Sequence, residues 1–182
     1  MPRTTSALLA SVGSHEILHF GGHAVVNRDF PLLSYLLMTP ERRVDTGLLY
    51  AHQLYDLRFN RTRLAVLAAC DTATGPIHGE GPLSLSRALL AAGAPAVVAS
   101  LWNVDDAETA RLFQIFYTRL AEGEDGAAAL RHAQLALLHA PGSHGPSTTW
   151  AAFELFGSFS GATNQKGRVS NEQLRAVGHR PM

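Results

Sequence analysis

The chain has 182 residues, a length typical of one domain and sufficient to bury a core without disulfide or metal staples. Hydrophobic residues make up 46% of it and charged residues 16%, and 15 basic side chains balance 15 acidic ones, so its charge favours neither nucleic acid nor an anionic membrane as a partner. No apolar run approaches the ~18 residues of a membrane helix, and the N-terminal apolar stretch is too short for a signal peptide, which predicts a cytoplasmic protein.

Four short apolar runs alternate with longer helical patterns, an alternation typical of an α/β fold with a mainly parallel sheet. The runs at 63–70 and 96–102 are apolar throughout, as expected of central strands. The run at 16–20 stops at a pair of glycines, and the run at 151–157 has the weakest pattern. Between 31 and 49, the pattern predicts two short strands around a polar turn.

Helices are predicted at 51–57, 82–95, 105–123 and 125–142. In the third of these, Asp105 and Glu108 have the spacing of a capping box, and an apolar face follows at Leu112, Phe113, Phe116 and Leu120. After residue 160 the apolar periodicity ends. We therefore expect one domain over residues 1–160 and a disordered polar tail over 161–182.

The stretch at 14–24, SHEILHFGGHA, contains the H-E-x-x-H signature of zinc proteases in His15, Glu16 and His19. That chemistry requires both histidines on one face of a helix, but two glycines follow within two turns, and each costs about 1 kcal/mol in a helix interior. Val25 also stands where the longer form of the motif has a third histidine. We expect no metal site, a solvated His15, and a hydrogen-bonded core position for His19 within a strand.

His23 and Cys70 follow two of the predicted strands. In an open α/β sheet, functional residues gather where loops leave the carboxyl ends of parallel strands, so neighbouring parallel strands would bring both residues to one edge. A free thiol of pKa ~8.5 is mostly protonated at neutral pH, and an adjacent imidazole raises its thiolate fraction. The alternative, that Cys70 is a small buried hydrophobe at a strand end, remains open on position alone.

A series of sequence blocks, in order, resembles the CHAT family of caspase-like cysteine peptidases, related to caspases and separase. The blocks are ILHFGGHA, LAVLAACDTATG, GEGPLSLSRALLAAGAPAVVASLWNVDDAETARLF, AALRHAQLALL and WAAFELFG, within residues 14–158. The resemblance implies a three-layer α/β/α caspase-like fold with a mainly parallel central sheet. A complete domain of this family carries further strands ahead of the histidine block, so we expect N-terminal strands to be missing here.

The resemblance also implies the site residues. The histidine of the family's H-F-x-x-H-G block corresponds to His23, and the cysteine of its A-C-x-T block corresponds to Cys70. The backbone N–H groups of Ala24 and Cys70 would then form the oxyanion hole, and no cofactor would be needed. Ala24 replaces the family's glycine, which raises the question of a backbone angle strained for alanine.

The loop after the run at 96–102 is implied to form the pocket for the substrate residue before the scissile bond. Trp102 is most simply a packing residue, and its alternative role is a wall of this pocket. The carboxylates of Asp105 and Asp106 would suit a basic substrate residue. A structural interpretation competes with this one, because Asp105 is well placed as a helix N-cap and Asp106 as first-turn charge that the helix dipole favours.

Two functions therefore follow from the sequence. The first is a cysteine endopeptidase that cleaves a protein or peptide substrate through His23 and Cys70. The alternative is a catalytically weak or inactive CHAT-like regulatory module that binds a partner, such as a helical-repeat domain of the tetratricopeptide type in the same or a partner chain. Neither nucleic acid nor a membrane is an expected partner.

Overall fold

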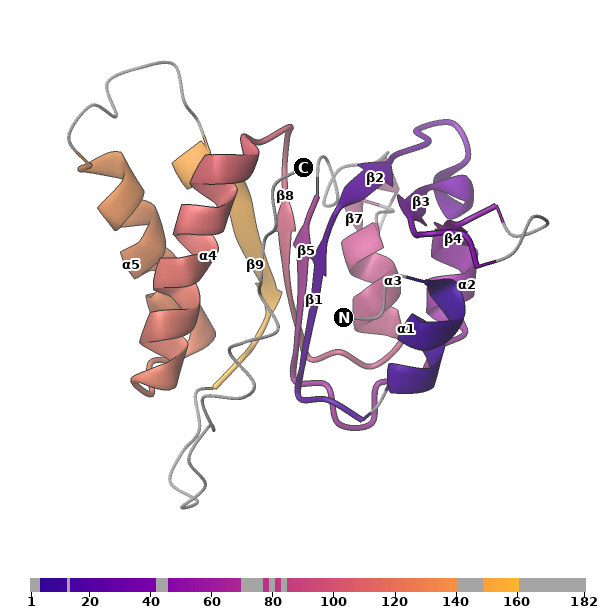
Figure 1. The fold of residues 1–182 in the computed structure, drawn as a ribbon, viewed down its shortest axis with the longest axis horizontal. Helices are drawn as coiled ribbons and strands as arrows, with labels where there is room; N and C mark the ends of the chain where they lie inside the picture. Colours follow the sequence, from indigo (N-terminus) through magenta and orange to yellow (C-terminus); the bar gives the residue numbers. More distant parts are fainter. Residues whose placement is uncertain are drawn as a thin grey trace.

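The computed structural model describes residues 4–12, 14–41, 46–69, 77–78, 81–82, 85–140 and 149–160. Its main sheet has the strand order β1-β5-β8-β9, with bounds β1 Ile17–Gly21, β5 Leu64–Ala68, β8 Ala96–Ser100 and β9 Phe153–Gly157 (Figure 1). The first three strands are parallel, and β9 runs antiparallel to β8. This arrangement confirms the prediction of an α/β fold with a mainly parallel sheet, and all four predicted strands are present.

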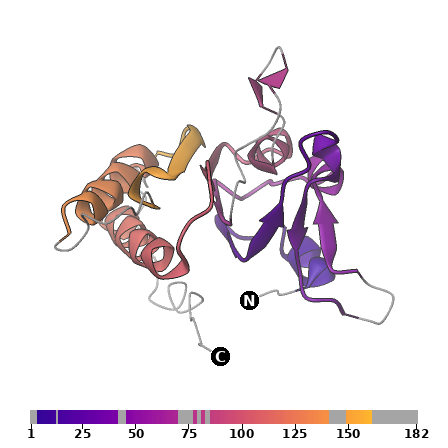
Figure 2. The same ribbon diagram turned by 90° about the horizontal axis from the view of Figure 1, so that it is seen from above.

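The central strands β5 and β8 are buried on both faces, which explains their unbroken apolar sequences. Because side chains alternate along a strand, Ala65 and Leu67 pack into one hydrophobic cluster, while Leu64 and Val66 pack into another on the opposite face. Figures 1 and 2 show α4 and α5 on one side of the sheet, with the shorter helices on the other side. Helices therefore cover both faces.

The helices have the bounds α1 Thr5–Ser11, α2 Ala51–Tyr55, α3 Leu85–Ala91, α4 Asp106–Ala121 and α5 Gly126–Leu138. Asp105 caps α4 by accepting a hydrogen bond from the backbone N–H of Glu108 at 2.9 Å, as the spacing predicts. Asp125 caps α5 in the same way through the N–H of Ala128 at 2.8 Å. Two short 3₁₀ turns, η1 Pro31–Leu33 and η2 Thr149–Ala151, complete the helical elements of the described chain.

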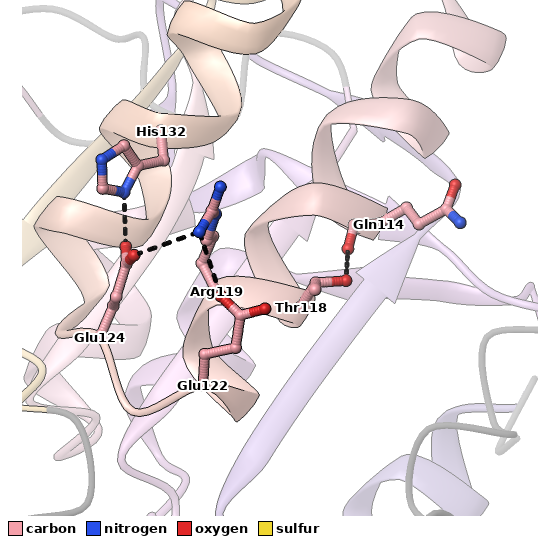
Figure 3. A network of polar contacts seen from close by, with 6 residues as sticks. All are labelled: Gln114, Thr118, Arg119, Glu122, Glu124 and His132. Atoms are coloured by element: carbon pink, nitrogen blue, oxygen red, sulfur yellow. Dashed lines mark hydrogen bonds and ion pairs between the residues drawn. The ribbon is translucent and has the colours of Figure 1, made fainter.

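A polar network joins α4 to α5 at their shared turn (Figure 3). Arg119 contacts Glu122 at 3.1 Å and Glu124 at 3.8 Å, and Glu124 also lies 2.6 Å from Nδ1 of His132. Gly123 has a φ of 97°, a left-handed angle that suits glycine at a helix end. Exposed pairs of this kind contribute only about 0–1 kcal/mol each, so the buried face of α4 matters more than this network.

A small antiparallel sheet has the order β2-β3-β4, with bounds β2 His23–Val25, β3 Tyr35–Leu37 and β4 Leu48–Tyr50. Strands β3 and β4, and helix α2 after them, confirm the predictions for 31–49 and 51–57. Strand β2 was not among the predicted strands. Three residues are too few to show a period of two, and pairing with β3 is what makes this segment a strand.

Two further elements, helix α1 and a short hairpin, were not predicted from the sequence. Helix α1 has a Thr4 side-chain cap, but only Leu8 of its described side chains is buried in the core, so its apolar periodicity is weak. A two-stranded hairpin pairs β6 Ile77–His78 with β7 Gly81–Pro82. Across the described parts of the chain, no helix has the length and apolar character needed to cross a membrane. The tail predicted to be disordered lies outside the described residues.

Candidate functional site

A cavity of about 360 Å³ opens at the carboxyl ends of β1 and β5, against the start of α4. It is lined by Gly22, His23, Ala68, Ala69, Val104, Asp105, Asp106 and Thr109. Three separate chain segments therefore meet there. This position is where open α/β sheets place their binding sites.

Strands β1 and β5 are parallel neighbours, which is the condition under which His23 and Cys70 were predicted to reach the same edge of the sheet. Their register pairs Gly21 with Ala68, so the chain leaves both strands at the same level of the sheet. A buried hydrogen bond from the Ser100 hydroxyl of β8 to the Ala69 carbonyl ties the end of β5 to its other neighbour. Cys70 follows Ala69 directly in the sequence and lies outside the described residues.

His23 is the first residue of β2, where it pairs with Leu37 of β3, and its side chain is exposed. The next residue, Ala24, pairs with Leu36 and packs against the hydrophobic cluster beneath the small sheet. A residue within a β-strand has an extended backbone, which alanine adopts as readily as other residues. The replacement of the family's glycine by Ala24 therefore introduces no left-handed angle at this position.

The first two turns of α4 form the other wall of the cavity. Asp105 has both roles considered from the sequence, since it caps the helix and also lines the cavity. Asp106 is exposed and lines the cavity beside it. Thr109, which sequence reasoning missed, lies one turn further along the same helix face. The i, i+4 spacing from Asp105 to Thr109 was the available signal.

Trp102 is not among the residues that line the cavity. It packs instead against the cluster of α4 and α5 side chains, and within the described chain its indole N–H is buried without a hydrogen-bond partner. The structure thus brings His23, Asp105 and Asp106 of the predicted site together and leaves Trp102 outside that group.

The H-E-x-x-H stretch is not helical. His15 and Glu16 are exposed residues ahead of β1, and His19 lies inside that strand. The His15 ring contacts the Ser14 hydroxyl at 2.7 Å. Because successive strand residues point to opposite faces, this segment lacks the single helical face that a zinc protease uses. The described residues contain no group of three or more side chains of metal-ligand type, namely His, Cys, Asp and Glu.

His19 is packed between β1 and α4. Its Nδ1 lies 2.6 Å from the Tyr117 hydroxyl, and its ring meets Phe113 edge-on with centroids 5.3 Å apart. Loss of hydration on burial lowers the pKa of His19 from 6.5 to about 4, and burial raises the pKa of the Tyr117 phenol. Both side chains are therefore neutral at pH 7, which agrees with the predicted core position of His19.

Comparison with known families matches residues 2–158 to the CHAT domain. Among curated proteins, Tetratricopeptide repeat protein 28 of Mus musculus is 37% identical over 111 residues, and its Homo sapiens counterpart is 35% identical over 111 residues. The match covers 61% of this chain but only 4% of each relative, so the chain spans a small part of these long proteins.

Proposed function

Because the chain belongs to the CHAT domain family, we propose that it is a cysteine endopeptidase acting through His23 and Cys70 in a caspase-like three-layer fold. The observation that carries this proposal is the cavity at the strand ends. His23 lines it, and so does Ala69, whose next residue in the sequence is Cys70. In this proposal, residues 1–160 form the catalytic unit.

The chemistry follows from a thiol beside an imidazole. His23 takes the proton of the Cys70 thiol, and the thiolate attacks the carbonyl carbon of the scissile peptide bond. The backbone N–H groups of Ala24 and Cys70 donate hydrogen bonds to the oxyanion that forms. His23 then protonates the leaving amine, and a water molecule, deprotonated by the same imidazole, hydrolyses the thioester and frees the thiol.

One observation supports His23 rather than His19 as the base. A general base must reach the substrate and must lie in contact with the site, and His23 is exposed at the cavity. The ring of His19 is engaged by Tyr117 and enclosed by aromatic side chains. Of the two histidines, only His23 lines the cavity.

The test compares cleavage of an unfolded protein, such as casein, by the full chain and by its Cys70→Ala and His23→Ala variants. Both substitutions are expected to abolish cleavage while circular dichroism shows a retained fold. His15→Ala is the matched control, because it removes an exposed histidine that does not line the cavity. Cleavage that persists in Cys70→Ala would disprove the peptidase proposal.

A second candidate function is a partner-binding module, and an exposed apolar surface favours it. Within residues 25–37, five large apolar side chains are between 45% and 65% exposed, namely those of Val25, Phe30, Leu32, Leu33 and Leu37. Leu37 pairs with His23 across β2 and β3, so this end of the segment lies next to a residue that lines the cavity. Exposed large apolar side chains can mark protein-binding sites, and the two relatives are named for tetratricopeptide repeats.

Binding separates the two candidates. Under the second candidate, a purified tetratricopeptide-repeat domain binds the wild-type chain and the Cys70→Ala variant equally, and Phe30→Ser weakens both. Under the peptidase proposal alone, Phe30→Ser leaves cleavage of casein unchanged. Isothermal titration calorimetry and a gel-based cleavage assay measure the two outcomes.

A further inference from the structure

We propose that one face of the small sheet binds the substrate residues that follow the scissile bond, and that Val25 and Leu37 make it select apolar side chains there. We call this surface the outer face, and it comprises the side chains of His23, Val25, Tyr35, Leu37, Leu48 and Tyr50. The inference rests on the proposed peptidase function. It concerns the part of the substrate that leaves as an amine, which is a different part from the residue before the bond.

The registers of the three short strands make the outer face continuous. Ala24, Leu36 and Leu49 pack into the hydrophobic core cluster, and successive strand residues point to opposite faces, so their neighbours along each strand share the other face. The pairing arranges these neighbours in two rows across the sheet, with His23, Leu37 and Leu48 in one row and Val25, Tyr35 and Tyr50 in the other. Directly opposed residues have Cβ atoms about 4.5–5.5 Å apart, so these side chains form one surface.

The outer face is apolar and open to solvent. Val25 is 45% exposed and Leu37 46%, and the rings of Tyr35 and Tyr50 meet edge-on beside them with centroids 5.6 Å apart. Apart from His23, neither row carries a side chain that is charged at neutral pH. A charged substrate residue would therefore lose hydration on this face without gaining a partner, whereas an apolar residue would remove the valine and leucine from water.

His23 joins the outer face to the cavity, because it belongs to both. In the proposed mechanism its imidazole protonates the leaving amine, so the nitrogen of the first residue after the scissile bond must come within hydrogen-bond reach of this ring. Leu37 lies directly opposite His23, and Val25 is two positions along β2, about 7 Å away at the rise of a strand. An extended substrate advances at the same rise, so its first residues after the bond span this surface.

The direction of the leaving segment follows from the position of the nucleophile. Cys70 comes directly after Ala69, which lines the cavity, so the proposed attack occurs on the cavity side of His23. The leaving segment then continues away from the cavity, over the small sheet. Figure 1 shows β2 continuing from the end of β1 with β3 and β4 beside it, on the side of the main sheet away from α4 and α5.

The experiment digests casein with the full chain and identifies each cut by mass spectrometry. Apolar residues are expected to be enriched just after the cut bond. Peptides built on the most frequent cut are then made identical before the bond and carry leucine and phenylalanine, two serines or two glutamates after it. The proposal predicts a kcat/KM about tenfold higher for the apolar peptide than for the serine peptide, with the glutamate peptide lowest.

Leu37→Thr and Val25→Thr are each expected to lower the ratio of kcat/KM for the apolar and serine peptides by about threefold, because each removes apolar contact but keeps a side chain suited to a strand. Leu37→Ile should retain the ratio. Leu138→Thr is the matched control, since Leu138 is an exposed leucine of α5 on the other side of the main sheet, and it should leave the ratio unchanged. A partial loss of folded protein would not alter this ratio, because both peptides are measured on the same variant.

The outcomes separate this inference from the proposed function. If casein is cut without preference after the bond, or if Leu37→Thr and Val25→Thr leave the ratio unchanged, the inference fails and the peptidase proposal stands. If casein is not cut, the peptidase proposal fails, and binding of two synthetic peptides decides. These begin, like a leaving fragment, with a free amine on leucine-phenylalanine or on serine-serine. Tighter binding of the apolar peptide, weakened by Leu37→Thr, would support the surface without a peptidase, and equal binding would overturn it.

Gel filtration and calorimetry of the Leu37→Thr variant test the other occupants of the outer face. A wild-type dimer that this substitution dissociates, with an unchanged peptide ratio, would assign the face to a second copy of the chain. Loss of binding to a tetratricopeptide-repeat domain, again with an unchanged ratio, would assign it to a partner protein. Either result would overturn the inference.

Discussion

His19 and His23 stand on either side of Gly21 and Gly22, and they differ in every property that decides chemical use. His19 is enclosed by aromatic rings on the α4 side of β1, bonded to Tyr117 and held neutral. His23 is exposed at the rim of a cavity that Asp105 and Asp106 also line. The face of β1 toward α4 is closed by packing, whereas the end of the same strand opens onto the cavity.

Position along the strand, rather than membership of the H-E-x-x-H motif, separates the buried histidine from the one that is exposed at the cavity. Within β1, alternation directs His19 into the layer between the sheet and α4, where desolvation opposes its charge. Beyond the strand end, the backbone enters a different sheet, and the His23 side chain is exposed. The following predictions test this contrast.

The largest expected effect is on catalysis. His23→Ala is expected to lower kcat/KM by roughly a thousandfold or more, because it removes the general base of the proposed dyad. It should change the unfolding free energy by only about 0.5 kcal/mol, since the side chain is exposed. His19→Ala should do the reverse, lowering stability while the folded fraction remains active. Equal loss of activity per folded molecule in both variants would contradict the contrast.

Stability should fall with acid because of His19. Its folded-state pKa of about 4 lies below the ordinary 6.5, so between these values the unfolded chain binds more protons. The contribution of neutral His19 is fully present above pH 6.5 and is lost as the pH falls toward 4, amounting to about 3 kcal/mol at most. Urea unfolding between pH 7.5 and 4.5 measures it.

His19→Gln is expected to remove this part of the pH dependence, and comparison with the wild type cancels the effect of carboxylates common to both. His15→Gln should retain it, because His15 is exposed. An identical pH profile for wild type and His19→Gln would show that burial does not hold His19 neutral.

Tyr117→Phe should cost about 1–3 kcal/mol of stability, because it leaves Nδ1 of His19 buried without its 2.6 Å partner. Tyr35→Phe is a suitable control, since the Tyr35 ring meets Tyr50 edge-on in the small sheet away from α4. Thermal unfolding measures both variants. A Tyr117→Phe variant as stable as wild type would mean that this hydrogen bond contributes nothing to holding β1 against α4.

The smallest expected effect compares two aspartates that cap helices, Asp105 and Asp125, of which only Asp105 also lines the cavity. Asp105→Ala and Asp125→Ala are each expected to cost about 1 kcal/mol, because each removes a side-chain acceptor from a helix N-terminus. Of these two variants, only Asp105→Ala should also lower kcat/KM for a cleaved peptide, since Asp105 lines the cavity and Asp125 does not. Parallel losses in both variants would assign the effect to stability alone.

The sequence predicted the elements whose periodicity persists over many residues. The buried face of α4, with Leu112, Phe113 and Phe116, follows from spacing alone, as do the doubly buried strands β5 and β8. Strand β2 could not be predicted, because three residues carry no period and only the partner strand β3 makes them extended. Helix α1 was missed for a related reason, namely that a single core contact through Leu8 leaves little pattern.

The residues that line the cavity were predicted in part. The positions of His23, Asp105 and Asp106 could be predicted, because each of these residues follows the end of a predicted strand. The prediction for His23 also required β1 and β5 to be parallel neighbours, and the structure confirms this pairing. The positions of Trp102 and Thr109 relative to the cavity depend on how α4 is rotated against the sheet, which residue spacing does not specify. Cys70 stays a prediction, because it lies outside the described residues.

The cavity draws its walls from the ends of β1 and β5 and from the start of α4, segments that are distant along the chain. Parallel strands pair only after long connections close, so such contacts form late and slowly in folding. A nascent or partly folded chain therefore has no assembled pocket. Under the proposed peptidase function, a freshly synthesised chain would therefore be unable to cut itself or its neighbours before its own sheet has formed.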